Sequence, residues 1–336
     1  MKVKLIAFGA IVLVAVAGTV FYVLRVHQRE ANAAASAPAV PVRDDLVAVQ
    51  RVPHLLFRST AVGNGFAKVA AVALDNPGGA RAFSPATCDR VYGRASVTLC
   101  LVIKRGIATT YAAQLLNAQW SAERQVPLPG LPSRARMSPD GSLLATTTFV
   151  FGDSYTNPGQ FSTRTVVSKV AGGGTDLDLE KFTVVVDGHP LAAADKNIWG
   201  VTFADDDTFY ATAASGKKTW LVQGSLSQRR MVSLREDVEC PSLSPDGTRI
   251  AFKKHGNLPK GQWRLAVYDL KTHTETMIAE QRSVDDQVEW LDNQQVLYGL
   301  PRGGTSISSD VWVAAADGTG TPKVFVADAW SPSVVR

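Results

Sequence analysis

Two segments of this chain are close copies of each other, and this repeat constrains the fold more than any other feature. Residues 137–145 read M-S-P-D-G-S-L-L-A and residues 243–251 read L-S-P-D-G-T-R-I-A. In each copy the proline presets φ for a turn, the aspartate can bond to its own backbone and the glycine supplies a positive φ. An apolar residue precedes the turn and an alternating strand follows it, so each copy predicts a β-hairpin.

Weaker copies of this layout continue through the chain, at residues 201–210, 288–298 and 329–335. The successive steps are 66, 40, 47 and 40 residues when the copies are aligned on Ser138, Ala204, Ser244, Leu291 and Ser331. Short apolar strands with polar turns fill each interval. We assign the long first step to a third unit with a long loop at 154–163 and an outer section that runs through Val186. A period of about 40 to 50 residues with several strands per repeat is typical of propeller blades.

The strand count from both ends of the chain predicts six blades. Only three strands, at 54–60, 67–74 and 80–83, precede the second unit, so the first unit lacks its innermost strand. Residues 328–335 form an innermost strand without a blade of its own. Pairing the two closes the circle and leaves no open sheet edge in it. We therefore predict an all-β fold, a six-bladed β-propeller over residues 46–336.

The N-terminus is a segment of a different kind. Residues 5–24 contain no charge, and as a helix they span about 30 Å, the hydrocarbon thickness of a bilayer. We predict a short flank at 1–4, a transmembrane anchor at 5–24 and an Ala/Pro-rich linker at 25–45. A cleaved signal peptide is the alternative, although the A-x-A sites lie beyond the polar stretch 25–32. The predicted location is the cell membrane, single-pass, with the C-terminal propeller extracytoplasmic, or secreted if the segment is cleaved.

The repeats also carry a family resemblance. The S-P-D-G copies, followed by W-R-L-A-V-Y-D-L at 263–270, resemble the TolB-like six-bladed β-propellers. The segments T-C-D-R-V-Y-G at 87–93, the longer 238–254 and S-V-D-D-Q-V-E-W-L-D at 283–292 look more closely like an actinobacterial TolB-like family of unassigned activity. The resemblance implies the propeller fold, and TolB itself is a soluble periplasmic partner of envelope proteins. The predicted anchor departs from that pattern.

Two of the three cysteines flank a predicted hairpin. Cys88 and Cys100 are separated by C-D-R-V-Y-G-R-A-S-V-T-L-C, with a turn expected near 93–96. Residues at equal distances from a turn lie opposite each other, close enough for a bridge. We predict a Cys88–Cys100 disulfide outside the cytoplasm, with two buried thiols as the alternative. Cys240 is expected in the core.

Candidate binding residues follow from the geometry of a propeller. Innermost strands line the central channel, and the residues that enter them ring one mouth. The predicted mouth residues are Arg134, Arg136, Trp199, Glu239, Asp285, Asp286 and Asp328. This mixed ring could bind a polar ligand or a peptide, or its charges could simply solvate the mouth and pair with one another. Burial could raise the pKa of one carboxyl among Asp285, Asp286 and Glu289 into an acid–base range.

Other site chemistry has little support in the sequence. None of the five histidines has a partner at metal-ligand spacing, and the Asp205–Asp207 run fits a turn better than a calcium site. No G-x-S-x-G is present. With 35 Lys+Arg against 30 Asp+Glu and no basic run, the chain is not expected to bind nucleic acid. We predict no metal and no cofactor.

These observations favour a non-enzymatic protein-interaction or scaffold module of the cell envelope, whose partner is an envelope protein or peptide. The membrane contact is made by the N-terminal helix. The alternative is a small-ligand binder or a metal-dependent lactonase-like hydrolase that uses the central channel. That alternative needs at least three convergent ligands from different blades around one channel ion.

Overall fold

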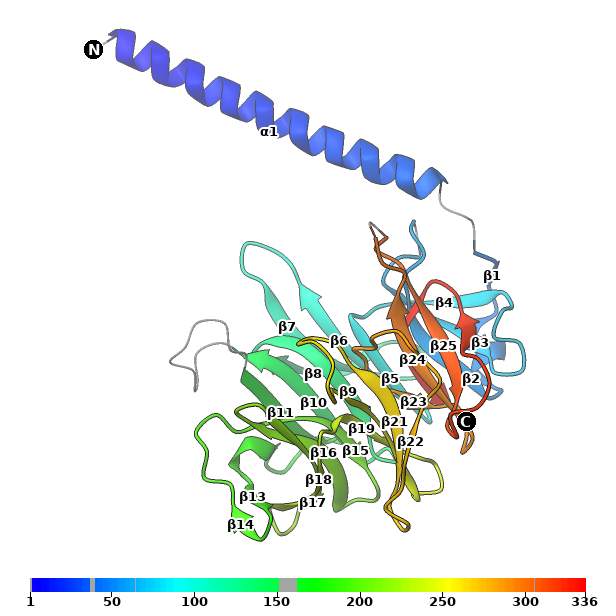
Figure 1. Cartoon of the computed structure of the whole chain (residues 1–336). Coiled ribbons are helices and arrows are strands. Elements are labelled where there is room, and N and C mark those ends of the chain that lie inside the picture. The colour runs from blue at the N-terminus through cyan, green and yellow to red at the C-terminus, as the bar shows by residue number, and fades with distance from the viewer. Residues whose placement is uncertain (1, 37–39, 64, 151–161, 305) are drawn as a thin grey trace.

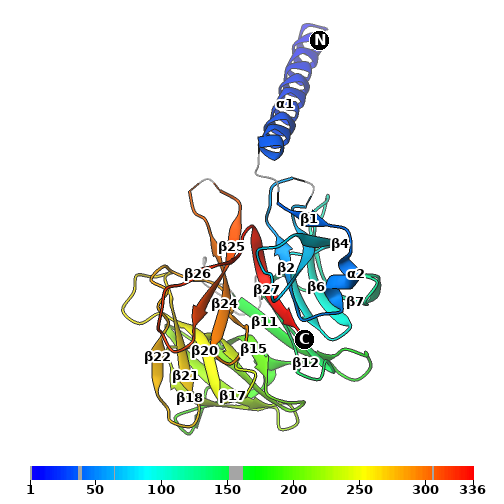
Figure 2. The ribbon, with the colours of Figure 1, turned by 90° about the vertical axis from the view of Figure 1, so that its right-hand side faces the viewer.

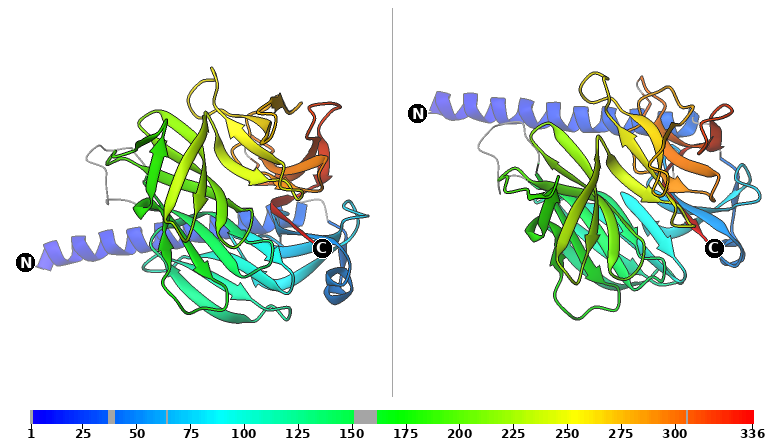
Figure 3. Two further views of the ribbon diagram at one scale, coloured as in Figure 1. Left: turned by 90° about the horizontal axis from the view of Figure 1, so that it is seen from below. Right: turned by 60° about the horizontal axis from the view of Figure 1, so that its bottom comes forward.

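The computed structural model describes residues 2–36, 40–63, 65–150, 162–304 and 306–336. It shows six β-sheets arranged in a ring, with one long helix at the N-terminus (Figure 1). Viewed from below, the sheets follow one another around the ring in chain order (Figure 3). The predicted six-bladed β-propeller is therefore confirmed. The predicted long loop at 154–163 lies, apart from its last two residues, outside the described residues.

The N-terminal helix α1 runs from Lys2 to Ser36. Its segment Ile11–Gln28 is long enough and apolar enough to cross a membrane, with a mean hydropathy of 1.7, and none of it is buried. A signal peptide would have the same properties. The helix continues through residues 25–36, where we expected a linker, because this stretch is rich in Ala, Arg, Gln and Glu, which are strong helix formers. Only residues 37–41 separate α1 from the first strand.

Blade 1 combines strands from the N-terminal and the C-terminal parts of the propeller sequence. Its sheet has the order β1-β4-β3-β2-β27, so the C-terminal strand is innermost (Figure 2). Strand β27 pairs antiparallel with β2, from His54 opposite Val335 to Ser59 opposite Ala329. This is the closure that the strand count predicts. The elements are β1 (Val42–Arg43), α2 (Leu46–Gln50), β2 (His54–Ser59), β3 (Lys68–Ala73), β4 (Arg81–Thr87) and β27 (Ala329–Val335).

Blades 2, 3, 5 and 6 each have four strands in chain order from the centre outward. Blade 2 comprises β5 (Arg90–Arg94), β6 (Val97–Lys104), β7 (Thr110–Leu116) and β8 (Ala122–Leu128). Blade 3 comprises β9 (Leu131–Met137), β10 (Leu143–Val150), β11 (Ser162–Lys169) and β12 (Leu177–Asp178). Blade 5 comprises β19 (Glu239–Leu243), β20 (Arg249–Lys254), β21 (Arg264–Asp269) and β22 (Glu275–Met277). Blade 6 comprises β23 (Glu289–Trp290), β24 (Gln295–Pro301), β25 (Ser309–Ala315) and β26 (Lys323–Val326).

Blade 4 has six strands and differs from the prediction. Its inner four are β15 (Asn197–Phe203), β16 (Thr208–Ser215), β17 (Lys218–Ser225) and β18 (Arg230–Glu236). The short helix η1 (Leu179–Lys181) is followed by β13 (Thr183–Val186) and β14 (His189–Pro190), which extend the outer edge of this blade. The section through Val186 was expected in blade 3, but β13 pairs parallel with β18 instead. It thereby covers an edge that would otherwise be open.

The repeated S-P-D-G segments form the hairpin turns that their residues predict. The Ser138 hydroxyl donates to Asp140 at 2.5 Å and accepts from the Leu143 N–H at 2.9 Å. The second copy repeats both contacts, with Ser244 to Asp246 at 2.5 Å and the Arg249 N–H to Ser244 at 3.0 Å. The glycine of each turn has a positive φ, +78° in the first and +70° in the second. These local bonds explain why the motif marks the first hairpin of a blade.

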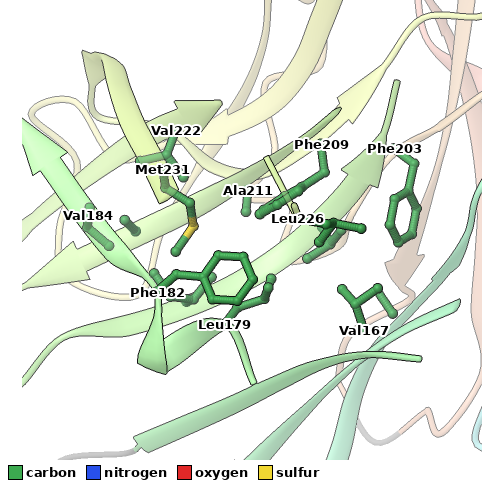
Figure 4. Close-up of a cluster of buried hydrophobic side chains, with 14 of the residues drawn as sticks. Val167, Leu179, Phe182, Val184, Phe203, Phe209, Ala211, Val222, Leu226 and Met231 are labelled. Carbon is green, nitrogen blue, oxygen red and sulfur yellow. The ribbon is translucent and has the colours of Figure 1, made fainter. Parts of the chain in front are cut away.

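The core consists of apolar clusters that lie between neighbouring blades. Among the described residues there are six such clusters, and each joins one blade to the next around the ring. Between blades 3 and 4, Val167 of β11 packs with Leu179, Phe182, Phe209 and other residues of the next blade (Figure 4). A blade is thus stabilised by its two neighbours, so a complete circle buries more apolar surface than an open one.

Candidate binding site at the mouth of the channel

A large cavity lies at the end of the propeller where the innermost strands begin. We call this end, with the loops that join second to third strands, the mouth face. The cavity has a volume of about 760 Å³. All six blades contribute to its wall, which comprises Arg90, Leu131, Pro132, Ser133, Arg134, Phe149, Trp199, Glu239, Cys240, Lys253, Trp263, Ser283, Asp285, Pro301 and Trp330.

Aromatic side chains form much of this wall. Trp199, Trp263 and Trp330 come from blades 4, 5 and 1, and Phe149 comes from blade 3. The Trp263 indole N–H donates to Glu239 Oε1 at 2.8 Å. The Arg90 guanidinium lies over the Trp330 ring, 5.0 Å from its centroid. Trp330 thus carries a cation on one face, and the aromatic rings together form an apolar part of the wall, as in sites that bind apolar or aromatic groups.

Lys253 organises the charged part of the wall. Its side chain is only 4% exposed, and its ammonium group is paired with Asp285 and lies 3.7 Å from Glu239 Oε2. The same group is 4.0 Å from the centroid of the Trp263 ring. Burial acts to raise the pKa of Asp285, but the charges of Lys253, Arg134 and Arg90 outweigh it and lower that pKa. Asp285 is therefore a carboxylate, and its side chain is 61% exposed toward the open cavity.

Arg134 lies between the cavity and the channel and is held by its neighbours. Its Nη1 donates to the carbonyl oxygen of Ser133 at 3.0 Å and to the hydroxyl at 3.2 Å, and its Nη2 lies 3.7 Å from Asp285. Its Nε is buried and has no hydrogen-bond partner among the described residues. The Nη2 group beside Asp285 is therefore the part of Arg134 that could donate to a ligand in the cavity.

Below the cavity the channel narrows to a polar pocket of about 20 Å³, enough for about one water molecule. Arg90 Nη1 bonds Asp286 Oδ1 at 2.8 Å, and the other oxygen of Asp286 accepts from the Gly299 N–H at 3.0 Å. Arg136 bonds the Val288 carbonyl at 2.6 Å and lies 3.3 Å from Glu289. These ion pairs line the narrow pocket, which is too small for anything larger than about one water molecule.

The structure divides the predicted mouth residues into three groups. Arg134, Trp199, Glu239 and Asp285 line the cavity together. Arg136 and Asp286 line the narrow pocket below it, each paired with an opposite charge. Asp328 lines neither, because it precedes β27 and pairs with Arg302 at 3.0 Å.

Four important wall residues were missed from the sequence: Arg90, Lys253, Trp263 and Trp330. The prediction used only residues that lead into innermost strands. A second strand runs back toward the mouth, however, so its last residues also reach the cavity, as Lys253 at the end of β20 does opposite Glu239. Trp263 follows in the β20–β21 loop for the same reason. Alternating strand direction within a blade would have found Lys253 and Trp263. Arg90 and Trp330 stand at the start of the innermost strands β5 and β27, so the rule that was used covers them and they were overlooked.

The acidic group Asp285, Asp286 and Glu289 is separated into individual ion pairs, with Lys253, Arg90 and Arg136. Burial raises the pKa of Glu289, against the opposing charges of Arg136 and Arg94. Glu289 lies in the channel wall with its carboxyl engaged by the Val334 N–H at 3.2 Å. Among the described residues no group of three or more His, Cys, Asp or Glu side chains could hold a metal ion.

The sulfur atoms of Cys88 and Cys100 are at bonding distance, with the Cα atoms 5.4 Å apart. The reasoning from equal distances to the turn was wrong, since Cys100 lies opposite Val91 in the β5–β6 pair. Cys88 precedes β5 and approaches Cys100 from the side of the hairpin. Cys240 is buried and contributes to the cavity wall.

Comparison with known proteins identifies the fold but no sequence family. No family model matches the chain, and no curated protein matches it. The structure is similar to TolB from Acinetobacter baumannii, with a TM-score of 0.62, 13% identity and coverage of 84% of this chain and 67% of that one. It is also similar to a puromycin-hydrolyzing peptidase of Mycobacterium tuberculosis, with a TM-score of 0.50, 13% identity and coverage of 82% and 45%. This chain thus corresponds to less than half of that peptidase. At such identities the likeness establishes the fold alone, and the chain has a TolB-like six-bladed β-propeller preceded by an apolar helix.

Proposed function

We propose that this protein is a membrane-anchored, extracytoplasmic propeller that binds an extended segment of an envelope protein in the mouth cavity and catalyses no reaction. The observation that carries the proposal is the cavity itself, about 760 Å³ lined by three tryptophans, a phenylalanine and charges of both signs. A side chain of a partner segment would pack between the rings. Its backbone would find a donor in the Nη2 group of Arg134 and an acceptor in Asp285.

The charge arrangement favours binding over catalysis. The three carboxylates that line the cavity and the narrow pocket are each within ion-pair distance of an arginine or lysine: Glu239 and Asp285 of Lys253, and Asp286 of Arg90. A metal-dependent hydrolase needs three or more convergent oxygen or nitrogen ligands that are free to bind the ion. Neutralised carboxylates are poor ligands for a cation. The arrangement therefore gives the lactonase-like alternative little support.

The location rests on α1 and on the resemblance to TolB-like proteins. An uncleaved α1 would hold the propeller at the membrane, and the disulfide would fit an oxidising compartment. A reporter enzyme that is active only outside the cytoplasm, fused after Arg336, should be active in cells. Mass spectrometry of the mature protein should find the N-terminal residues retained. Activity of a reporter that works only in the cytoplasm would refute the proposed topology. Loss of the N-terminal residues would show that the protein is secreted and not anchored.

Site-specific photo-crosslinking in intact cells tests the binding function. Benzoylphenylalanine at Leu131, which lines the cavity and is 39% exposed, should capture an envelope protein. The matched control is Gln228, an exposed turn residue at the opposite end of the propeller. A synthetic peptide of the captured segment should then quench the tryptophan fluorescence of the purified chain, and Trp263→Ala should weaken that binding.

Two results would overturn the proposal. Capture at position 131 that is no stronger than at position 228 would show that the cavity does not meet a protein. Tight, saturable binding of a sugar or metal ion by the purified chain, together with no capture in cells, would favour the small-ligand alternative.

A further inference from the structure

The chain enters the propeller at the mouth face. The Pro41 carbonyl accepts a hydrogen bond from the Arg81 N–H at 2.9 Å, next to the first strand pair of β1 with β4. The Arg81 guanidinium in turn donates to the carbonyls of Ala327 and Asp328, at 2.8 and 3.1 Å. Asp328 immediately precedes β27, so it stands at the mouth end of an innermost strand. The tether from α1 is thus attached beside the mouth.

The tether is short. Five residues, 37–41, separate Ser36 from Val42, and such a segment reaches at most about 20 Å. The helix beyond the apolar window, from Gln28 to Ser36, adds about 12 Å. In Figures 1 and 2 the helix lies on the side to which the β24–β25 loop of the mouth face points. A bilayer that holds α1 is therefore within reach of this face of the propeller.

Loops of the mouth face end in exposed isoleucines. Ile107 lies at the tip of the β6–β7 loop and is fully exposed, and Ile307 in the β24–β25 loop is 65% exposed. Lys104 and Arg105 are exposed beside Ile107 and make no ion pair among the described residues. An isoleucine at a loop tip flanked by basic residues is suited to the boundary between lipid headgroups and acyl chains.

The distribution of charged residues between the two faces also favours contact of the mouth face with an anionic surface. In the described residues, the loops that join second to third strands hold Arg105, Lys217, Lys260 and Arg302 but no Asp or Glu. Among the acidic residues of the mouth face, Asp286 and Asp328 are paired with arginines, and Asp285, which is 61% exposed, is paired with Lys253.

On the opposite face the turns between first and second strands are acidic, whereas the outer turns also hold cations such as Arg229 and Lys271. The turns between first and second strands of blades 3 to 6 carry Asp140, Asp205–Asp207, Asp246 and Asp292. An anionic surface would attract the loops of the mouth face and repel these turns.

We infer that the mouth face lies against the anionic surface of the bilayer that holds α1, with Ile107 and Ile307 at the headgroup boundary and the neighbouring cations on lipid phosphates. The inference rests on the anchoring proposed above. It does not depend on which ligand the cavity takes.

The test uses the full chain in nanodiscs of equal parts phosphatidylcholine and phosphatidylglycerol, doped with a lipid that carries a nitroxide headgroup. Ile107→Cys or Ile307→Cys is labelled with NBD, and Gln228→Cys on the opposite face is the matched control. Labelling is selective because Cys88 and Cys100 are bonded to each other and Cys240 is buried. We expect a several-fold loss of NBD fluorescence at 107 and 307, and little at 228. The pair Lys104→Glu/Arg105→Glu, or nanodiscs without phosphatidylglycerol, should reduce the quenching at 107.

The outcomes separate the two proposals. A chain that does not co-elute with nanodiscs would overturn the anchoring, because α1 would then not hold the bilayer. A chain that co-elutes but shows equal quenching at 107 and 228, or stronger quenching at 228, would overturn the orientation alone. Quenching at 107 that is insensitive to the glutamate pair and to lipid charge would refute the electrostatic part of the argument.

Discussion

Lys253 provides the sharpest test of how the mouth is held together. Its ammonium group is nearly inaccessible, paired with Asp285 and 3.7 Å from Glu239. Methionine has a similar length but no charge, so Lys253→Met removes the cation and keeps most of the packing. Asp285 remains hydrated by the cavity, whereas Glu239, with a side chain only 14% exposed, is left with the Trp263 N–H as its one described partner. The cost should therefore come mainly from Glu239.

The magnitude follows from the distance and the burial. At an effective dielectric constant of about 20, two unit charges at 3.7 Å attract by about 4.5 kcal/mol, and part of this offsets the desolvation of the lysine. Loss of one partner from a buried pair costs about 3–5 kcal/mol in general. We expect Lys253→Met to lower the free energy of unfolding by about 3 kcal/mol. The double variant Lys253→Met/Glu239→Gln should recover about half of that loss or more, because the amide oxygen can still accept from Trp263 without carrying a charge.

Urea denaturation followed by circular dichroism measures these differences. The neighbouring Lys254 is a matched control, since it pairs with Glu275 at 2.7 Å but its side chain is 21% exposed. Lys254→Met should cost about 1 kcal/mol or less. A loss at Lys253 no greater than at Lys254, or a double variant no more stable than Lys253→Met alone, would refute the argument from a buried charge.

Three further predictions concern other parts of the propeller. Burial raises the pKa of Glu180 to about 8, above its ordinary 4.5, so the native state keeps a proton that the unfolded chain has lost between these values. The stability that this group contributes is fully present below pH 4.5 and is lost as pH rises through 8. The free energy of unfolding of Glu180→Gln, relative to that of the wild type, should therefore increase by at most about 5 kcal/mol from pH 5 to pH 9. A difference between the two proteins that is the same at both pH values in urea denaturation would contradict this. Reduction of the Cys88–Cys100 bond, which closes a separation of 12 residues, should cost about 3 kcal/mol in urea titrations with and without reductant, while Cys88→Ser/Cys100→Ser should not respond to reductant. In Gly299→Ala the new methyl group would overlap the Trp330 ring, so we expect a loss of about 1–3 kcal/mol and altered tryptophan emission, and an unchanged spectrum would show that the mouth relaxes freely.

The blade pattern could be predicted because the determinants of its turns are local. Ser138 and Asp140 satisfy the backbone of their own turn, and Ser244 and Asp246 do the same one repeat later. Such bonds depend on residues within five positions of each other, so they are visible in the sequence. The closure of the ring followed from counting, since three strands at one end and one at the other complete a sheet.

Features that depend on contacts between distant segments could not be predicted in the same way. The parallel pairing of β13 with β18 joins residues about 47 positions apart, and no local pattern distinguishes it from a fourth strand of blade 3. Cys88 meets Cys100 from outside the hairpin, which depends on the β5–β6 register. Asp328 looks like a mouth residue by position, but Arg302 holds it outside the cavity.

The position of the tether also bears on which partner the cavity would meet. In the arrangement proposed above, the cavity and the membrane anchor lie on the same side of the molecule, because Pro41 bonds Arg81 and the Arg81 guanidinium reaches Asp328 beside the mouth. A partner segment that is itself attached to the bilayer would then be confined to the region near the membrane surface that also contains the cavity. Its effective concentration there would far exceed that of a freely diffusing protein. The same geometry disfavours a large soluble partner, which would have to enter between the propeller and the lipid. A membrane-attached protein with an extended segment close to the surface is therefore the partner that the anchor, the cavity and the charged loops together favour.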